Sequence, residues 1–287
     1  MTSLLSKLGL GSGQFGFDQP ALRGRPREAE ARDILAIAAR SGLGVLEVGR
    51  HSQAAESMLG QALPRPNPFR VTLTTVRPDR GPDLVEAEVR AQMRRMGVER
   101  VDALLAPSAT DLFSPLGPQL WDRLRALKDA GLCSKIGVSV YASDDPIGLT
   151  KRFKPDVIQA PASLLDQRLL IDGTLAELCE MGVEVHLRSI FLNGVLFLPP
   201  DRAPSHLKAA AGRISRARRL IAEGRSDPLQ AALGFALSRP EASAVLVGVG
   251  SAAEMSAVVA AAMSPPPDLD WDEMALDDPE ALAWAAA

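Results

Sequence analysis

Glu47 and His51 are titratable residues placed where a strand predicted over Val45–Val48 gives way to a loop. They lie four positions apart across that junction, so their side chains could meet over a pocket. A histidine poised by a carboxylate is a common acid or base near neutral pH, which makes both residues catalytic candidates. In the alternative interpretation, His51 is an ordinary loop histidine and Glu47 pairs with Arg50 or another arginine.

His186 and Arg188 form a second polar group, on a strand predicted over Val183–Arg188. Because they alternate along the strand, both face the same side of the sheet. Buried polar groups are usually hydrogen-bonded, so we expect His186 to be a satisfied core residue. Arg188 is a candidate ligand contact, because a planar guanidinium can stack on a ring or pair with a phosphate or carboxylate.

These residues must be positioned by a recurring pattern of a short apolar run, a turn and an amphipathic stretch. The predicted strands are Leu8–Leu10, Val45–Val48, Arg70–Val76, Val101–Ala106, Lys135–Val140, Asp156–Gln159, Val183–Arg188 and Ala244–Val247. The predicted helices include Glu28–Ser41, Ala54–Leu63, Leu84–Met96, Trp121–Ala130, Thr174–Met181, Leu229–Leu237 and Ala252–Ala262. Eight such units in 287 residues predict an α/β protein with a closed (β/α)8 TIM barrel. An open doubly wound sheet is the competitor, but the Gly-rich segment Leu8–Gly16 does not open a helix directly, as that fold requires.

The composition predicts one soluble domain. No composition shift marks a boundary, so residues 1–287 are expected to form a single barrel, with residues 264–287 as a tail packed outside it. The net charge of −3 argues against nucleic acid or an anionic membrane as a partner. No apolar stretch has the length of a membrane span or the form of a secretion signal. Cys133 and Cys179 are far apart in apolar segments, which favours buried thiols in a reducing, cytoplasmic compartment and no metal site.

Five segments, in this order and at this spacing, resemble the aldo/keto reductases, a family of nicotinamide-dependent (β/α)8 barrels. They are Leu8–Gly16; Gly44–Gly60, with Glu56-Ser-Met-Leu-Gly60; Val101–Leu105; Gly137–Ser139 with Asp156–Pro161 and Leu165-Asp166; and Arg188–Gly194 with Val247–Glu254. The resemblance covers essentially the whole chain. It implies a site at the C-terminal ends of the barrel strands.

The family's reaction uses four groups. A Tyr donates the proton to the substrate carbonyl, a Lys lowers the pKa of that Tyr, an Asp pairs with the Lys, and a His orients the carbonyl. By spacing, the Asp, Tyr, Lys and His positions are Glu47, Ser52, Thr75 and Pro107 in this sequence. All four depart from the pattern, and a register shift of one or two residues restores none of them. The single tyrosine, Tyr141, belongs to the fifth strand, so the family's usual proton relay is not expected here.

The positions that bind the cofactor in the family match its pattern better than the four catalytic positions do. The resemblance implies that Ser139 and Gln159 hold the nicotinamide amide, although Val140 replaces the family's Asn. Arg188 stands where an aromatic ring usually stacks on the nicotinamide. The positions implied for the pyrophosphate and adenosine end are Ser189, Asn193, Gly194, Gly248, Ser251 and Glu254, the last three at a helix N-terminus that would favour an anion. Residues 248–254 contain no Lys or Arg, so the sequence does not choose between NAD and NADP.

Three functions stay open. The first is a pseudoenzyme-like barrel with a degenerate active site, which keeps a nicotinamide-nucleotide or small-ligand pocket for binding or repurposed chemistry. The second is an active NAD(P)-dependent oxidoreductase or isomerase, acting on a sugar-like or natural-product carbonyl or alcohol, with Glu47 and His51 as nonstandard groups. The third is a ligand-free structural or partner-binding homologue. Losing a general acid typically costs 10² to 10⁴ in rate, so slow turnover alone would not separate them.

Overall fold

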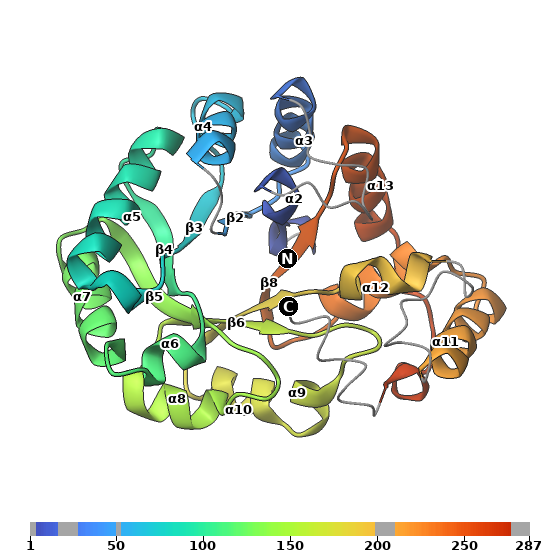
Figure 1. Ribbon diagram of the computed structural model, residues 1–287. Coiled ribbons are helices and arrows are strands. Elements are labelled where there is room, and N and C mark those ends of the chain that lie inside the picture. The colour runs from blue at the N-terminus through green and yellow to red at the C-terminus, as the bar shows by residue number, and fades with distance from the viewer. Residues whose placement is uncertain (1–3, 17–27, 50–52, 199–209, 277–287) are drawn as a thin grey trace.

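The computed structural model describes residues 4–16, 28–49, 53–198 and 210–276. Eight parallel strands in it close into a barrel in chain order, with β8 hydrogen-bonded to β1, and helices surround them (Figure 1). The strands are β1 (Leu8–Gly11), β2 (Val45–Val48), β3 (Arg70–Thr74), β4 (Val101–Ala106), β5 (Cys133–Ser139), β6 (Val157–Pro161), β7 (Glu184–Arg188) and β8 (Ala242–Gly248). The predicted (β/α)8 barrel is confirmed.

The helices that follow the strands begin and end at recognisable signals. The longer ones are α3 (Glu28–Arg40), α4 (Gln53–Ala62), α5 (Pro82–Met96), α7 (Gly117–Asp129), α8 (Pro146–Phe153), α10 (Thr174–Glu180), α11 (Ala211–Glu223), α12 (Pro228–Leu237) and α13 (Ala252–Met263). The shorter ones are α1 (Leu4–Lys7), α2 (Gly13–Gly16), α6 (Ala109–Phe113), α9 (Arg168–Ile171) and the 3-10 turns η1 (Pro78–Arg80), η2 (Leu192–Phe197) and η5 (Asp272–Met274). Gly97 ends α5 with a left-handed backbone (φ 64°), and the Asp227 side chain accepts from two backbone N–H groups at the start of α12.

The barrel interior is packed, so it is a core and not a channel. Buried apolar residues of the strands form two clusters that are separate from the main core between strands and helices: Val45, Ala244 and Leu246, and Ala103, Leu105 and Val157. Gly9 faces the first cluster, where a Cβ atom would come within 2.7 Å of Leu246.

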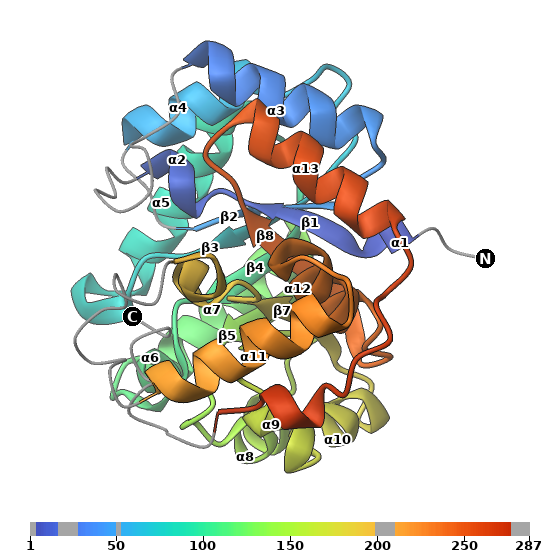
Figure 2. The ribbon, with the colours of Figure 1, turned by 90° about the vertical axis from the view of Figure 1, so that its right-hand side faces the viewer.

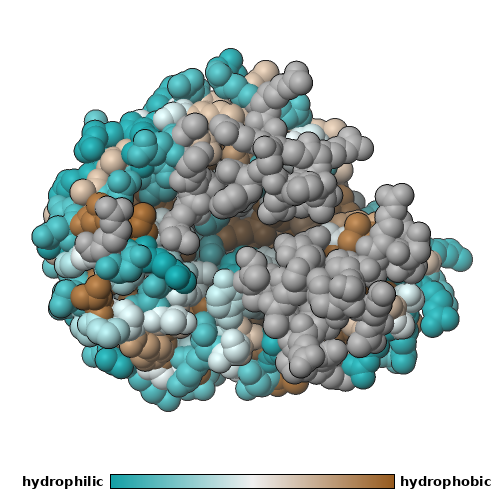
Figure 3. Space-filling model, in the orientation of Figure 1, coloured by the Kyte–Doolittle hydropathy of each residue, from teal (hydrophilic) through white to brown (hydrophobic). Residues whose placement is uncertain are grey.

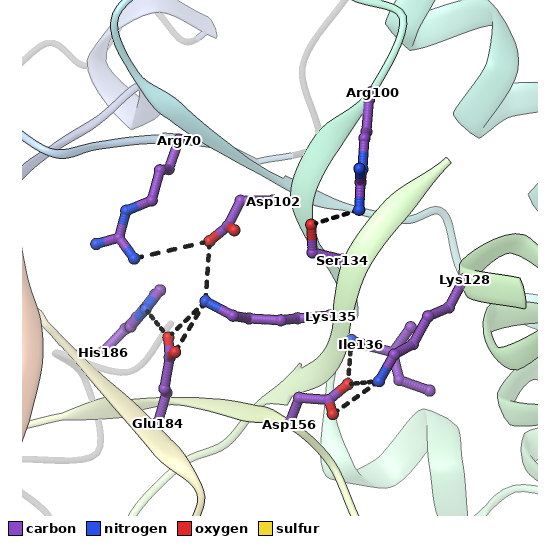
Figure 4. Close-up of polar contacts among 10 residues, drawn as sticks. All are labelled: Arg70, Arg100, Asp102, Lys128, Ser134, Lys135, Ile136, Asp156, Glu184 and His186. Atoms are coloured by element: carbon purple, nitrogen blue, oxygen red, sulfur yellow. Dashed lines mark hydrogen bonds and ion pairs between the residues drawn. The ribbon is translucent and has the colours of Figure 1, made fainter. Parts of the chain in front are cut away.

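The N-terminal end is closed by a charged network (Figure 4). Lys135 Nζ lies 3.3 Å from Oδ2 of Asp102 and 2.8 Å from Oε1 of Glu184. Arg70 approaches the same Asp102, and Nε2 of His186 lies 3.7 Å from Oε2 of Glu184. His186 is buried, as expected, but its partner is a carboxylate at ion-pair distance, and neither ring nitrogen has a hydrogen bond within the described chain.

The described part of the C-terminal tail packs on the outside of the barrel, with η5 beside α11 (Figure 2). Trp271 stacks edge-on against Phe235 of α12, and its carbonyl accepts from Gln167 at 2.6 Å. Residues 277–287 lie outside the described residues. Cys133 is buried as expected, but the expectation for Cys179 was wrong, because α10 presents it to solvent.

Candidate functional site

The C-terminal ends of the strands face the viewer in Figure 1, and the surface is hollowed at the centre of this face (Figure 3). Apolar side chains are visible inside the hollow. Strands β2, β5, β6 and β7 each place a polar side chain at this end: Glu47, Ser139, Gln159 and Arg188. We refer to these four residues as the barrel mouth.

Ser139 and Gln159 are brought together by strand pairing. They are direct neighbours in the β5–β6 register, and Ser139 Oγ lies 3.3 Å from Oε1 of Gln159. Gln159 is buried, and its Nε2 has no acceptor among the described residues. Since rotation about its last torsion can turn either end of the amide, this side chain has hydrogen-bonding capacity that the chain itself does not use.

Arg188 reaches from β7 across to the loop that follows β5. Its Nη2 donates to the Val140 carbonyl at 2.9 Å, and its Nη1 donates to Ser189 Oγ at 3.1 Å. The guanidinium carbon lies 4.7 Å from the centre of the Tyr141 ring, which is a cation–π contact. The buried Nε has no acceptor in the part of the chain that the structure describes. Arg188 therefore stacks on a ring, as the sequence allowed, but the ring belongs to the protein.

Glu47 lies in the mouth beside Gly11, where its carboxylate is in van der Waals reach of a Cβ built on that glycine. Loss of hydration raises the pKa of Glu47 from 4.5 to about 7, although the nearby Arg188 charge and the Ser12 backbone N–H lower it. At neutral pH both protonation states of Glu47 are populated. Such a carboxyl can either give or take a proton.

The N-terminus of α13 already has acceptors for its backbone N–H groups. Glu254 accepts from Gly250 N–H at 2.7 Å, Glu30 of α3 accepts from Ala252 N–H at 2.5 Å, and Ser251 caps Glu254 N–H. Two carboxylates thus occupy the position where a helix N-terminus would favour a bound anion. The carbonyl of Phe191 likewise accepts the Gly194 N–H, at 2.8 Å.

The comparisons with known proteins identify the family. The family model for the aldo/keto reductase family matches residues 7–275. This chain belongs to the aldo/keto reductase family. No curated protein matched it.

Two solved aldo/keto reductases show how closely the fold is kept. The holo form of AKR11C1 from Bacillus halodurans is 19% identical, with a TM-score of 0.73 over 98% of this chain and 92% of that chain. The glycerol dehydrogenase AKR11B4 from Gluconobacter oxydans is 18% identical, with a TM-score of 0.70 over 99% of this chain and 92% of that chain. At these identities the likeness shows the fold alone.

The positions of the family's catalytic groups are only partly described. Glu47 lies in the mouth, and Thr75 and Pro107 directly follow β3 and β4. Thr75 is buried, and its Oγ1 has no partner within the described ranges. Ser52 and His51 lie outside the described residues, so the pairing of Glu47 with His51 stays a prediction.

The aldo/keto reductase cofactor fits one end of this site and not the other. The unpartnered Nε2 of Gln159, with Ser139, suits the carboxamide of a nicotinamide ring. The α13 end does not suit a phosphate, because Glu30 and Glu254 take the donors and add negative charge. Side-chain contacts of Asn193 lie outside the described set, and the described residues contain no group of three or more metal-ligating side chains. They also contain no helix that is long and apolar enough to cross a membrane.

Tyr141 and Glu30 make contacts that were not predicted from the sequence. Tyr141 was set aside because it is on the fifth strand, yet it stacks on Arg188. Its position two residues after Ser139, at a strand end, was the available signal. No sequence signal pointed to Glu30, because Ala252, whose N–H it accepts, lies 222 residues away in the chain.

Proposed function

We propose that this aldo/keto reductase-family barrel binds a small polar ligand in its mouth and does not use the family's usual Tyr–Lys relay. The observation that carries the proposal is the unused hydrogen-bonding capacity of Gln159 and Arg188 at the ends of neighbouring strands. A buried polar group without a partner costs about 1–3 kcal/mol, and a ligand oxygen would offset that cost. The nicotinamide ring of NAD or NADP is the first candidate, with Ser139 and Gln159 holding its carboxamide and Arg188 beside it.

The experiment is a titration with nicotinamide mononucleotide, NAD, NADH, NADP and NADPH, followed by melting temperature and calorimetry. We expect a rise in melting temperature, because a ligand at about a hundred times its Kd stabilises the folded state by about 2.7 kcal/mol. The absence of any shift at millimolar concentration would count against a nicotinamide ligand.

A variant tests whether Gln159 is the contact. Gln159→Leu removes an amide with an unpartnered nitrogen, so we expect the ligand-free stability to change by less than about 1 kcal/mol. Binding of a responding ligand should weaken at least about fivefold, or about 1 kcal/mol. Gln119→Leu, on the exposed face of α7, is the matched control and should leave both quantities unchanged.

A second candidate function is proton transfer by Glu47, because its pKa of about 7 makes it both acid and base at neutral pH. An isomerase-type reaction needs no added oxidant, so exchange of α-protons of hydroxy-carbonyl compounds with deuterated solvent can reveal it by NMR. Glu47→Gln and His51→Ala should each remove exchange seen with the wild type. Wild-type exchange rates in both variants would end this candidate, and a protein that binds no ligand would favour the structural homologue.

A further inference from the structure

Arg188 is a cation that forms no ion pair with a carboxylate among the described residues. Its three described contacts are a backbone carbonyl, a serine hydroxyl and the Tyr141 ring, all of them neutral. Arg188 appears in none of the ion pairs of the described residues, whereas Arg95, Arg123 and Arg168 each bind a carboxylate at 2.8 Å or less. The guanidinium offers five N–H donors in a fork that matches a carboxylate, and its buried Nε–H has no acceptor among the described residues.

The charged groups that face Arg188 do not replace a counter-ion. Glu47 of β2 and Asp144, in the loop after β5, both act on it through space. Asp144 is engaged elsewhere, since its Oδ2 accepts from the Tyr141 N–H at 2.8 Å. Glu47 holds a proton for part of the time at neutral pH. On the same strand, His186 lies one layer below and is directed toward Glu184 at the opposite end (Figure 4).

We propose that the ligand of the barrel mouth carries a carboxylate, which Arg188 binds, and a neighbouring carbonyl or hydroxyl oxygen, which the Gln159 amide binds. This rests on the proposed function, a small polar ligand in the mouth, and it names an acid as that ligand in place of the nicotinamide carboxamide, because both would use the same Gln159 amide. A short 2-oxo or 2-hydroxy acid has both features. A carboxylate is favoured over a phosphate, because the second charge of a phosphate would lie beside Glu47 and Asp144 and would cost more to remove from water.

Carboxylate binding is coupled to the protonation of Glu47. The bound anion neutralises Arg188 and adds a second negative charge to the mouth, and both changes favour the protonated form of Glu47. In the free protein at pH 8, Glu47 is mostly ionised, so binding takes up a proton. The affinity for a carboxylate therefore falls as the pH rises through and above 7.

The test is calorimetry with pyruvate and lactate as probes, compared with pyruvamide and nicotinamide as neutral probes and with inorganic phosphate. We expect pyruvate or lactate to bind at least about tenfold more tightly than pyruvamide and than phosphate. Titrations at pH 8 in two buffers of different ionisation enthalpy should show uptake of up to one proton. Glu47→Gln should remove the buffer dependence.

The variants locate the contact. Arg188→Met should weaken pyruvate binding at least about tenfold, and Arg188→Lys should weaken it less, because it keeps the charge and loses the fork. Arg152→Met is the matched control, since Arg152 is an exposed residue of α8 that also lies over aromatic rings, those of Phe113 and Phe153, and is not part of the barrel mouth, so binding should be unchanged.

Three results would overturn the proposal: equal affinity for pyruvamide and pyruvate, tighter binding of phosphate, or pyruvate binding that Arg188→Met does not change. The comparison of probes on the wild-type protein needs no variant to fold. If nicotinamide or pyruvamide binds and the acids do not, the proposed function stands and the carboxylate is wrong. If none of the probes and no dinucleotide binds, both the proposed function and the carboxylate proposal are wrong.

Discussion

Glu47 makes the stability of the protein depend on pH in a direction that is unusual for an acid. Its pKa is raised from 4.5 to about 7 by loss of hydration, so between these values the folded state holds a proton that the unfolded state has lost. The free energy of unfolding therefore falls as the pH rises from about 4.5 to 7, and the loss is complete above 7. Because the side chain keeps some exposure to the hollow, we expect Glu47→Gln to recover about 2 kcal/mol at pH 8 and almost nothing at pH 4.

Urea unfolding of both proteins from pH 4 to 9 measures this difference. Glu223→Gln, an exposed acid on α11, makes the same chemical change and should give a constant difference near zero across the range. A Glu47→Gln protein that is destabilised equally at pH 4 and pH 8 would show that Glu47 is an ordinary ionised residue.

Sequence spacing could place Glu47, Ser139, Gln159 and Arg188 at strand ends, because a parallel barrel puts every such end on one face. It could not predict what they contact. Arg188 stacks on Tyr141 because its long side chain spans from β7 to the loop after β5. Such a contact depends on rotamers and neighbouring loops, which a single sequence does not specify.

At the scale of elements, the N-terminus of α13 predicts the cofactor preference of any dinucleotide binding. The family resemblance puts the adenosine end there, and Glu30 and Glu254 would face the 2′-phosphate of NADP. The carboxylates and the phosphate carry like charges and repel one another, and this repulsion is strongest at low ionic strength. We expect NADP to bind at least about fivefold more weakly than NAD, a difference of about 1 kcal/mol.

The double variant Glu30→Gln with Glu254→Gln should bring the two dissociation constants together in calorimetry at low salt. Glu28→Gln removes one acid from the exposed start of the same α3 helix, where it pairs with Arg32, and should not change the ratio. A preference for NADP in the wild type, or a ratio that the double variant leaves unaltered, would contradict the charge argument.

The helix predicted over Leu229–Leu237 is α12. It begins one residue earlier, at Pro228, and the Asp227 side chain caps it. Asp145-Pro146 begins α8 in the same way, and Asp145 caps Gly148 N–H at 2.9 Å, but no helix was predicted over these residues. Strand β3 ends at Thr74, two residues before the predicted end, because an apolar run does not stop where strand pairing stops.

For the whole molecule, the barrel was predictable because eight apolar runs in sequence order require no knowledge of side-chain contacts. The charged network that closes the N-terminal end of the barrel could not be predicted in this way. Arg70, Asp102, Lys135 and Glu184 come from four different strands, and their meeting depends on the stagger of those strands (Figure 4). In barrels of this type that end serves stability, while the other end carries function.

Lys135 is the centre of this closure. Lys135→Met keeps the length of the side chain but leaves Asp102 and Glu184 without their shared cation. Removing one partner of a buried ion pair costs about 3–5 kcal/mol, and since both acids keep some exposure we expect about 2 kcal/mol at pH 7. Urea unfolding with the exposed control Lys151→Met, whose ion pair with Glu177 should contribute less than about 0.5 kcal/mol, measures the difference.

The stability that Lys135 contributes depends on pH in the direction opposite to the effect of Glu47. His186 and Lys135 lower the pKa of Glu184 to about 2, so the charged form stabilises the fold above pH 4.5, and that contribution is lost as the pH falls toward 2. The cost of Lys135→Met should therefore shrink between pH 5 and pH 3, as the two acids become protonated without their cation. A cost that stays constant down to pH 3 would mean that Lys135 acts through packing of its methylene chain, which methionine largely keeps, and not through its charge.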